Sequence, residues 1–439
     1  MSDLEIGLLS IVGVLVLVYA GIHIAIALAG LSFVCVWIIR DDFDTAGRLF
    51  ALAAGESLQR YEFGVIPLFV LMGLFVSISD IGRDTYEVAN HLFRRVRAGL
   101  GTATVAANAV FAAVTGTSIA SASVFTKVAV PEMLRLGYKP RFAVGVVAGS
   151  SVLGMLIPPS LLLILFGILA ETSIGDLFIA GIIPGILLAF LYCAQIFIVA
   201  RIWPDYVQSG MKERVAAGKS LLTPMQIFTK ITPIVLLILI VLGGIYGGVF
   251  TATEAGGVGA FAALIFTLLR GRLNWMSLWR VLVETGHVTA AICILLISAH
   301  LYSRMIALTG IPNELEAAIL SLGLGKFAII AIYLVLICLM GTILDAGSIM
   351  LITIPIIVPA LQPFDIDLIW LGIITIIAVE IGLLTPPFGL ACFVIHNNLE
   401  DRRISLNDIF FGAAPYVITM AVVLILVTAF PGIALVLVN

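Results

Sequence analysis

The chain has 439 residues, of which 62% are hydrophobic and only 11% charged, and its mean hydropathy is +1.20. A soluble domain cannot cover that much apolar surface, so the composition excludes an ordinary globular protein and predicts about ten or more membrane-embedded helices of roughly 20 residues each. The net charge of −3 says nothing about partners, and no basic block points to nucleic acid. The acidic residues 1–5 lack the basic region of a cleaved signal peptide.

The chain is predicted to begin with two short helices, because residues 6–39 are too long for one ordinary span and Gly21 can divide them. Residues 41–62 are predicted to lie at the membrane interface, and residues 63–79 to form a span. A cytoplasmic loop follows, because it carries four arginines: Arg83, Arg94, Arg95 and Arg97.

Residues 100–134 form an apolar stretch with basic residues on both sides, which places both of its ends in the cytoplasm. It is long enough for two helices, either a crossing pair or a re-entrant hairpin. Its middle, residues 115–121, is polar and contains Gly116. Polar backbone at that depth is tolerated only against protein or a water-filled cavity.

Residues 142–170 are predicted to form a broken transmembrane helix. Pro158 and Pro159 remove two backbone donors and prevent a continuous helix. Residues 178–200 then return to a cytoplasmic loop marked by three basic residues, Lys212, Arg214 and Lys219.

The second half repeats this plan in the opposite orientation. Residues 231–250 and 259–269 are predicted to be spans on either side of a turn at 251–257. Residues 275–284 are predicted to form a second interfacial stretch, followed by a span over 288–306.

A second hairpin is predicted over residues 327–361, on the outer face, because its flanks carry Lys326, Asp365 and Asp367 rather than a cluster of basic residues. A second broken helix follows over residues 368–395. Arg402 and Arg403 are predicted to be cytoplasmic, and residues 413–438 to form the last span.

The two halves carry the same interruption. Gly-x-Leu-x-Pro-Pro begins at Gly154 and again at Gly382, and each copy follows a Gly-Thr hairpin tip. The opposite loop charges predict inverted-topology repeats over residues 1–220 and 221–439. The fold class is therefore an all-α polytopic membrane protein with two re-entrant hairpins and two broken helices, and such paired breaks are the best sequence pointer to a transporter's binding site.

Several motifs resemble one family. They are Val-Ile-Pro-Leu-Phe-Val at 65–70, Thr-Gly-Thr-Ser at 115–118, Leu-Ile-Pro-Pro-Ser at 156–160, Ile-Pro-Gly at 183–185, Thr-Glu-Ala at 253–255 and Glu-Ile-Gly-Leu-Leu-Thr-Pro-Pro-Phe-Gly-Leu at 380–390. Together they cover nearly the whole chain in order, and the chain resembles the large membrane subunit of the tripartite ATP-independent periplasmic (TRAP) transporters. The resemblance implies an elevator mechanism in the bacterial inner membrane, Na⁺ as coupling ion, a small four-helix membrane subunit and a periplasmic substrate-binding protein.

The expected sodium ligands are hard oxygens from the hairpin tips and the breaks. They are Thr115, Gly116, Ser118, Gly154, Gly341, Thr342, Asp345 and Thr385. Asp345 is a carboxylate at bilayer depth, which suggests function, although helix capping explains it as well. The expected contacts of a small organic anion are Ser118, Ser121, Pro158, Pro159, Ser160, Thr385, Pro386 and Pro387.

Three charged residues are further candidates. Glu380 is a possible ligand, proton carrier or structural ion-pair partner, and Lys127 and Arg304 are possible anion contacts, although long cations near helix ends usually extend to the interface. No other cofactor or metal is expected, since the five cysteines and five histidines lack metal-ligand spacing.

Four other functions are alternatives to this prediction. A P-loop is excluded because position 213 is Glu rather than Gly in the segment that ends at Lys219 and Ser220. An intramembrane protease lacks its motif, and a channel fits inverted repeats poorly. A proton-coupled or exchange transporter of the same fold, working without a binding protein, is the main alternative to sodium-coupled uptake.

Overall fold

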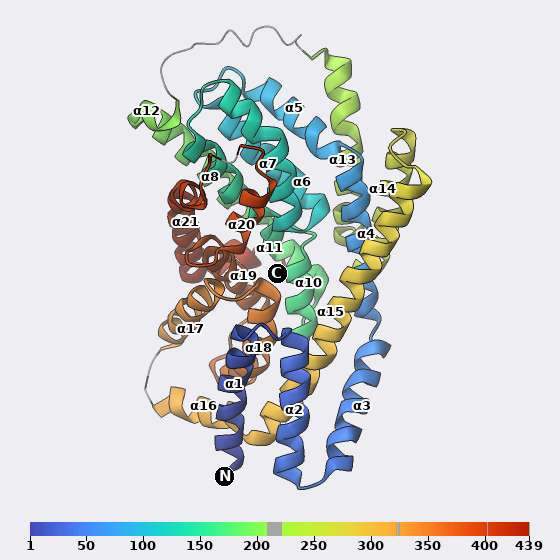
Figure 1. Ribbon diagram of the computed structural model, residues 1–439, viewed down its shortest axis with the longest axis vertical. Helices are drawn as coiled ribbons and strands as arrows, with labels where there is room; N and C mark the ends of the chain where they lie inside the picture. The colour runs from blue at the N-terminus through green and yellow to red at the C-terminus, as the bar shows by residue number, and fades with distance from the viewer. Residues whose placement is uncertain (209–221, 322, 324, 402, 439) are drawn as a thin grey trace.

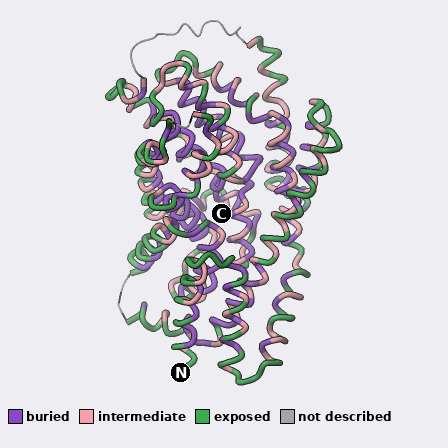
Figure 2. The backbone as a smooth tube through the Cα atoms, in the orientation of Figure 1, coloured by how far each residue is buried: buried purple, intermediate pink, exposed green. Residues whose placement is uncertain are grey.

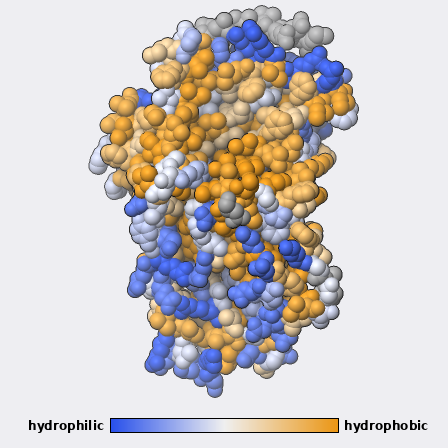
Figure 3. Space-filling model, turned by 180° about the vertical axis from the view of Figure 1, so that it is seen from behind, coloured by the Kyte–Doolittle hydropathy of each residue, from blue (hydrophilic) through white to orange (hydrophobic). Residues whose placement is uncertain are grey.

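The computed structural model describes residues 1–208, 222–321, 323, 325–401 and 403–438. Within this part, seven helices are long and apolar enough to cross a membrane, or eight if one bent pair counts as a single span, and four shorter apolar helices accompany them. Hydrophobic side chains cover much of the surface in Figure 3, while hydrophilic ones gather in its lower half and along its upper edge. The prediction of a polytopic helical membrane protein is confirmed in this coarse form.

The N-terminal segment forms three helices of 17 residues each, α1 (Asp3–Tyr19), α2 (Ile24–Arg40) and α3 (Phe43–Gln59). The predicted division near Gly21 is present, since the chain leaves helical geometry between α1 and α2, and Gly21 has a φ of +88°. α3 packs against α2 and against the long helix α15.

The first hairpin and broken helix follow the predicted boundaries closely. The helices from here to the middle of the chain are α4 (Val65–Ile78), α5 (Ile81–Phe93), α6 (Gly99–Thr115), α7 (Ser118–Arg135), α8 (Pro140–Ser151), α9 (Leu153–Leu156), α10 (Leu161–Leu169), α11 (Ile174–Ile202) and α12 (Pro204–Val207). The α8–α9 segment and α10 form the bent pair, with an angle of 42° at the break. The predicted loop residues Lys212, Arg214 and Lys219, and the predicted boundary at 220/221, lie outside the described residues, as does Arg402.

The second half contains α13 (Pro224–Tyr246), α14 (Ala252–Leu269), α15 (Trp275–Thr309), α16 (Ile311–Ser321), α17 (Lys326–Gly341), α18 (Ala346–Leu361), α19 (Leu368–Leu384), α20 (Leu390–Asn398), α21 (Leu406–Ala429) and α22 (Gly432–Leu435). One prediction here was wrong. Residues 275–284 are not a separate interfacial stretch, because α15 continues through them as one helix of 35 residues. No proline interrupts this segment, and the capping box of Asn274 and Ser277 fixes its start.

The two hairpins and two broken helices interlock. α10 packs against α18, and α20 packs against α7, so that each broken helix supports the hairpin of the other half. The Ser123 hydroxyl of α7 donates to Asn398 of α20 at 3.1 Å. Buried residues concentrate in this region, whereas the helices around it expose many side chains (Figure 2).

Equivalent hydrogen bonds join each hairpin to its own broken helix. The Asn108 amide of α6 donates to Ser150 of α8 at 2.6 Å, and the hydroxyls of Tyr333 and Thr375 join α17 to α19 at 3.0 Å. Asn108 and Tyr333 each lie eight residues before a tip glycine. The two halves therefore share this connection although the residue types differ. In Figure 1 the first hairpin lies in the upper half of the view and the second in the lower half.

A frame of α2, α4, α13, α14 and α15 packs beside the hairpins. An ion cluster joins this frame to α5, which packs on the first hairpin: Asp84 accepts from Lys230 of α13 and from Arg270 at the end of α14. Lys230 also contacts Glu87 at 2.8 Å.

Candidate functional site

The first hairpin tip docks on the first break through its backbone. α6 ends at Thr115, Gly116 turns with a φ of +64°, and the Thr117 hydroxyl caps α7 by accepting from the Ala120 amide. The Leu161 amide donates to the Gly116 carbonyl at 3.1 Å. A Cβ on Gly116 would lie 2.6 Å from the Pro159 carbonyl oxygen. Only glycine fits this position, because a side chain would meet backbone and the left-handed φ disfavours it as well.

Gly154 completes this contact from the other side, since a Cβ there would lie 2.6 Å from the Thr117 carbonyl oxygen. We call residues 115–118 together with 154–160 the first tip–break unit. Backbone carbonyls and hydroxyls therefore meet where the two chain segments interrupt their helices.

The second tip–break unit, residues 341–345 with 382–388, is built the same way. A Cβ on Gly341 would lie 2.8 Å from the Gly382 Cα, and one on Gly382 would lie 2.5 Å from the Gly341 Cα. The Phe388 amide donates to the Thr342 carbonyl at 3.2 Å, which matches the Leu161 bond in the first unit. The Pro158–Pro159 and Pro386–Pro387 peptide bonds are both cis.

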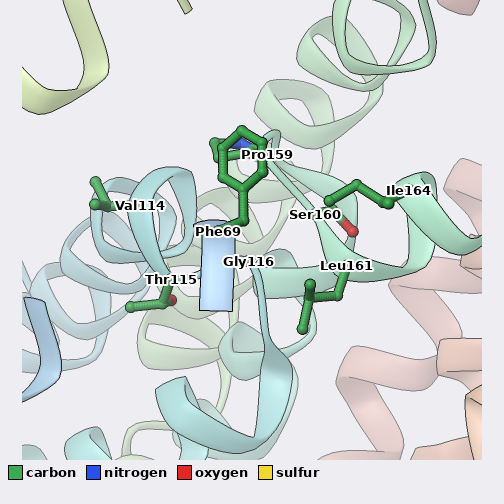
Figure 4. A pocket seen from close by; sticks show the side chains of 8 residues that line it. All are labelled: Phe69, Val114, Thr115, Gly116, Pro159, Ser160, Leu161 and Ile164. Carbon is green, nitrogen blue, oxygen red and sulfur yellow. The ribbon is translucent and has the colours of Figure 1, made fainter. Parts of the chain in front are cut away.

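A narrow cavity, too small to hold a water molecule, adjoins the first unit. Figure 4 shows the side chains that line it: Phe69, Val114, Thr115, Gly116, Pro159, Ser160, Leu161 and Ile164. The Thr115 hydroxyl donates to the Phe111 carbonyl, and the Ser160 hydroxyl donates to the Met155 carbonyl. Because both hydroxyl protons are engaged, these oxygens have only lone pairs to offer to a ligand, which suits a cation better than an anion.

The second unit is much more open. Pro386 and Pro387 are exposed and Thr385 is half-buried, whereas Pro158, Pro159 and Ser160 are buried. Asp345 is exposed and is the N-cap of α18, where it accepts from the amide and the hydroxyl of Ser348. The capping explanation for Asp345 is thus confirmed, and it leaves carboxylate lone pairs free for a second role.

Glu380 lies in α19 with a side chain only 1% exposed. The hydroxyl of Ser118, the first residue of α7, lies beside its carboxyl group. Neither carboxyl oxygen has a hydrogen-bond partner within ordinary geometry among the described residues. Ser121, one turn further along α7, is also buried with a hydroxyl that lacks a described partner.

The two candidate cations do not join this site. Arg304 of α15 pairs with Glu56 of α3, and the neighbouring His300 hydrogen-bonds Ser57 at 2.7 Å, so Arg304 lies in the frame. Lys127 is exposed on α7. Within the described residues no group of three His, Cys, Asp or Glu side chains could hold a metal ion.

Sequence reasoning missed Phe69 as a lining residue. It lies on α4, far along the chain from both breaks, and packs edge-on against Phe178 of α11 at 5.8 Å between ring centroids. Its only sequence signal was its place in the Val-Ile-Pro-Leu-Phe-Val motif. The proximity of Ser118 to Glu380 was missed as well, because it joins the two halves.

Interlocked hairpins and broken helices beside long apolar helices define a multi-pass membrane protein. A solved structure of the same fold, the YdaH transporter of Alcanivorax borkumensis, superposes with a TM-score of 0.58 at 15% identity and covers 89% of this chain and 90% of that one.

The sequence further matches the family described as the tripartite ATP-independent periplasmic transporter, DctM component, over residues 11–433, and the chain belongs to this family. The C4-dicarboxylate TRAP transporter large permease protein DctM of Pseudomonas aeruginosa is 32% identical over 89% of this chain and 90% of that protein. The sialic acid TRAP transporter permease protein SiaT of Haemophilus influenzae is 26% identical over 86% of this chain but only 60% of that protein. The chain is therefore an inner-membrane transporter permease and not an enzyme.

Proposed function

We propose that the chain carries out sodium-coupled uptake of a small organic anion delivered by a periplasmic binding protein. The observation that carries this proposal is the pair of tip–break units, in which two helical hairpins present backbone carbonyls and hydroxyls to two proline breaks. Interrupted helices of this kind coordinate cations and anionic groups in secondary transporters. The named substrates of the two relatives, C4-dicarboxylates and sialic acid, are carboxylates.

The first sodium site is assigned to oxygens of Thr115, Gly116, Ser118 and Gly154, and the second to Gly341, Thr342, Asp345 and Thr385. Support for the first comes from hydroxyls whose protons are already engaged, as at Thr115. Support for the second comes from Asp345, an acidic cap at a helix start, together with the Thr385 hydroxyl, which donates to the Ile381 carbonyl.

The substrate site is assigned to both tips and both breaks. The contacting residues are Ser118, Ser121, Pro158, Pro159, Ser160, Thr385, Pro386 and Pro387. Pro386 and Pro387 of the second unit are exposed, which leaves them accessible to a substrate.

In this proposal transport follows an elevator mechanism. The moving part consists of the re-entrant hairpins and broken helices, α6–α10 and α17–α20. These belong to two inverted repeats, residues 1–220 and 221–439. The packing of α10 on α18 and of α20 on α7 supports movement as one body. Frame helices such as α2, α14 and α15 stay in place, braced by the Glu56–Arg304 pair.

Two partners complete the transporter, a small four-helix membrane subunit and a periplasmic substrate-binding protein. The match covers only 60% of the SiaT permease, so that protein has a further part outside the match. One specific observation favours a second candidate, proton-coupled or exchange transport without a binding protein: the buried carboxyl group of Glu380 is suited to carry a proton.

The test is uptake of a radiolabelled C4-dicarboxylate, and separately of sialic acid, into proteoliposomes that contain this chain and its small subunit. We expect uptake under an inward Na⁺ gradient only when the binding protein is present. Uptake driven by a proton gradient alone, or without any binding protein, contradicts the proposal and supports the second candidate.

A further inference from the structure

The carboxyl group of Glu380 has no role in the sodium sites assigned above. It is buried, and both of its oxygens lack hydrogen-bond partners among the described residues. A carboxyl group in the protein interior is costly unless something compensates it, so an unpartnered one indicates an interaction that is completed by a ligand. None of the ion pairs within the described residues includes Glu380.

The helices around Glu380 carry buried hydroxyl groups. The Ser118 hydroxyl of α7 lies beside the carboxyl group, and α11, which carries Tyr192, packs against α19. The Tyr192 hydroxyl is fully buried and also lacks a described partner. Ser121, another buried hydroxyl without a described partner, shares the face of α7 with Ser118 because the two are three residues apart. Among the described residues, the carboxyl group therefore has the Ser118 hydroxyl beside it and no cationic side chain paired with it.

The carboxyl group belongs to only one of the two halves. Glu380 precedes Gly382 by two residues, and the residue at the same place before Gly154 is Val152, which is buried and apolar. Glu380 thus extends from the second half to the tip of the first hairpin. The start of α7 alone would attract an anion, but a carboxyl group at that point reverses the preference toward a cation.

We propose that Glu380 is the charge partner of the Na⁺ that binds at the first hairpin tip, which rests on the proposed sodium coupling. The Na⁺ neutralises the buried carboxylate, and the carboxylate holds the Ser118 hydroxyl with its lone pairs toward the ion. A buried pair of this kind also makes the first sodium site depend on both halves of the chain.

The experiment measures Na⁺ binding by the full chain in lipid nanodiscs, without substrate or binding protein. The readouts are the rise in unfolding temperature on replacing choline by Na⁺ and the binding of ²²Na⁺. We expect the wild-type chain to be stabilised in a saturable way, since a ligand that binds only the folded state stabilises it. Glu380→Gln, which keeps the shape and removes the charge, is expected to raise the half-saturating Na⁺ concentration at least about tenfold, equivalent to about 1.4 kcal/mol.

Two further variants separate charge from packing. Glu380→Asp keeps the charge on a shorter side chain and is expected to shift half-saturation less than Glu380→Gln does. Thr375→Val on the same helix removes a buried hydroxyl that contacts Tyr333 of the second hairpin and is expected to leave half-saturation unchanged. If Glu380→Gln does not fold, Glu380→Asp decides the question through a measurable shift relative to Thr375→Val.

The outcomes separate this inference from the proposed function. A wild-type chain that responds equally to Na⁺ and choline overturns both. A wild-type response that Glu380→Gln reproduces at the same Na⁺ concentrations overturns the role of Glu380 alone and leaves sodium coupling in place. The same shift in Thr375→Val as in Glu380→Gln shows a packing effect and also overturns the role of Glu380.

Discussion

In the first tip–break unit Pro158, Pro159 and Ser160 are buried, whereas in the second unit Pro386 and Pro387 are exposed and Phe388 is 48% exposed. Both units have the same backbone docking, so the docking does not determine the exposure. The neighbouring helices determine it. α11 packs tightly over the first break, where a Cβ on Gly181 would lie 2.7 Å from the Leu156 carbonyl oxygen, and Phe69 of α4 lines the remaining cavity.

The comparison shows that the same docking of a hairpin tip on a proline break is compatible with a covered and with an exposed surface, because the neighbouring helices differ. Experiments that alter the shared backbone, the exposure or the surrounding frame test three separate parts of this comparison.

The largest effect is expected from the shared backbone contacts. Gly382→Ala places a Cβ 2.5 Å from the Gly341 Cα, and Gly154→Ala places one 2.6 Å from the Thr117 carbonyl oxygen. Because backbone cannot move aside as a flexible side chain does, each change is expected to cost about 3 kcal/mol or more and to abolish uptake. Unfolding temperature and uptake measure this, with Gly286→Ala as control, since nothing lies within 4 Å of a Cβ there. Tolerance of one change but not the other would show that the two units are not equivalent.

The second effect concerns exposure. A thiol at position 388, in Phe388→Cys, is expected to react with a water-soluble maleimide roughly a hundredfold faster than one at position 160, in Ser160→Cys, because a buried thiol reacts only after local opening. The measurement is the labelling rate on a background without the five native cysteines. Equal rates in the absence of Na⁺ would contradict the difference in exposure between the two units.

The smallest effect concerns the frame beside the first unit. Asp84 is 16% exposed and accepts from both Lys230 and Arg270. Asp84→Asn leaves these two cations without their shared partner and is expected to lower stability by about 1–2 kcal/mol, between the values typical of surface and buried pairs. Thermal unfolding measures this. Asp401→Asn, which breaks an exposed pair with Arg403, is expected to leave the unfolding temperature unchanged, and a similar loss in both variants would mean that the cluster at Asp84 has no special role.

Much of the fold was predictable because its helices end at residue types that cannot continue a helix. Adjacent prolines cannot continue a helix, and a glycine followed by a hydroxyl residue ends one helix and caps the next. The ends of α6, α7, α17 and α18 therefore lie close to the predicted positions. The same reasoning failed at α15, where charged and aromatic residues suggested an interface although no residue there interrupts a helix.

The site was predictable only in part. Gly116, Gly154, Gly341 and Gly382 were all singled out, and the structure brings them together in pairs. The difference in exposure between the units was not predictable, because it depends on α4 and α11, which carry no matching motif. The approach of Glu380 to Ser118 depends on packing between halves, and a single sequence has no local signal for such a contact.

The packing of each broken helix against the hairpin of the other half has a consequence for biosynthesis. α7 ends at residue 135, yet α20, which packs against it, ends at residue 398. At about 5–20 residues per second, the ribosome needs roughly 15–50 s to make the chain between them. During that time the first hairpin waits in the membrane without its partner. The insertion machinery or the lipid must shelter the side of α7 that later packs on α20, including Ser123, until translation is nearly complete.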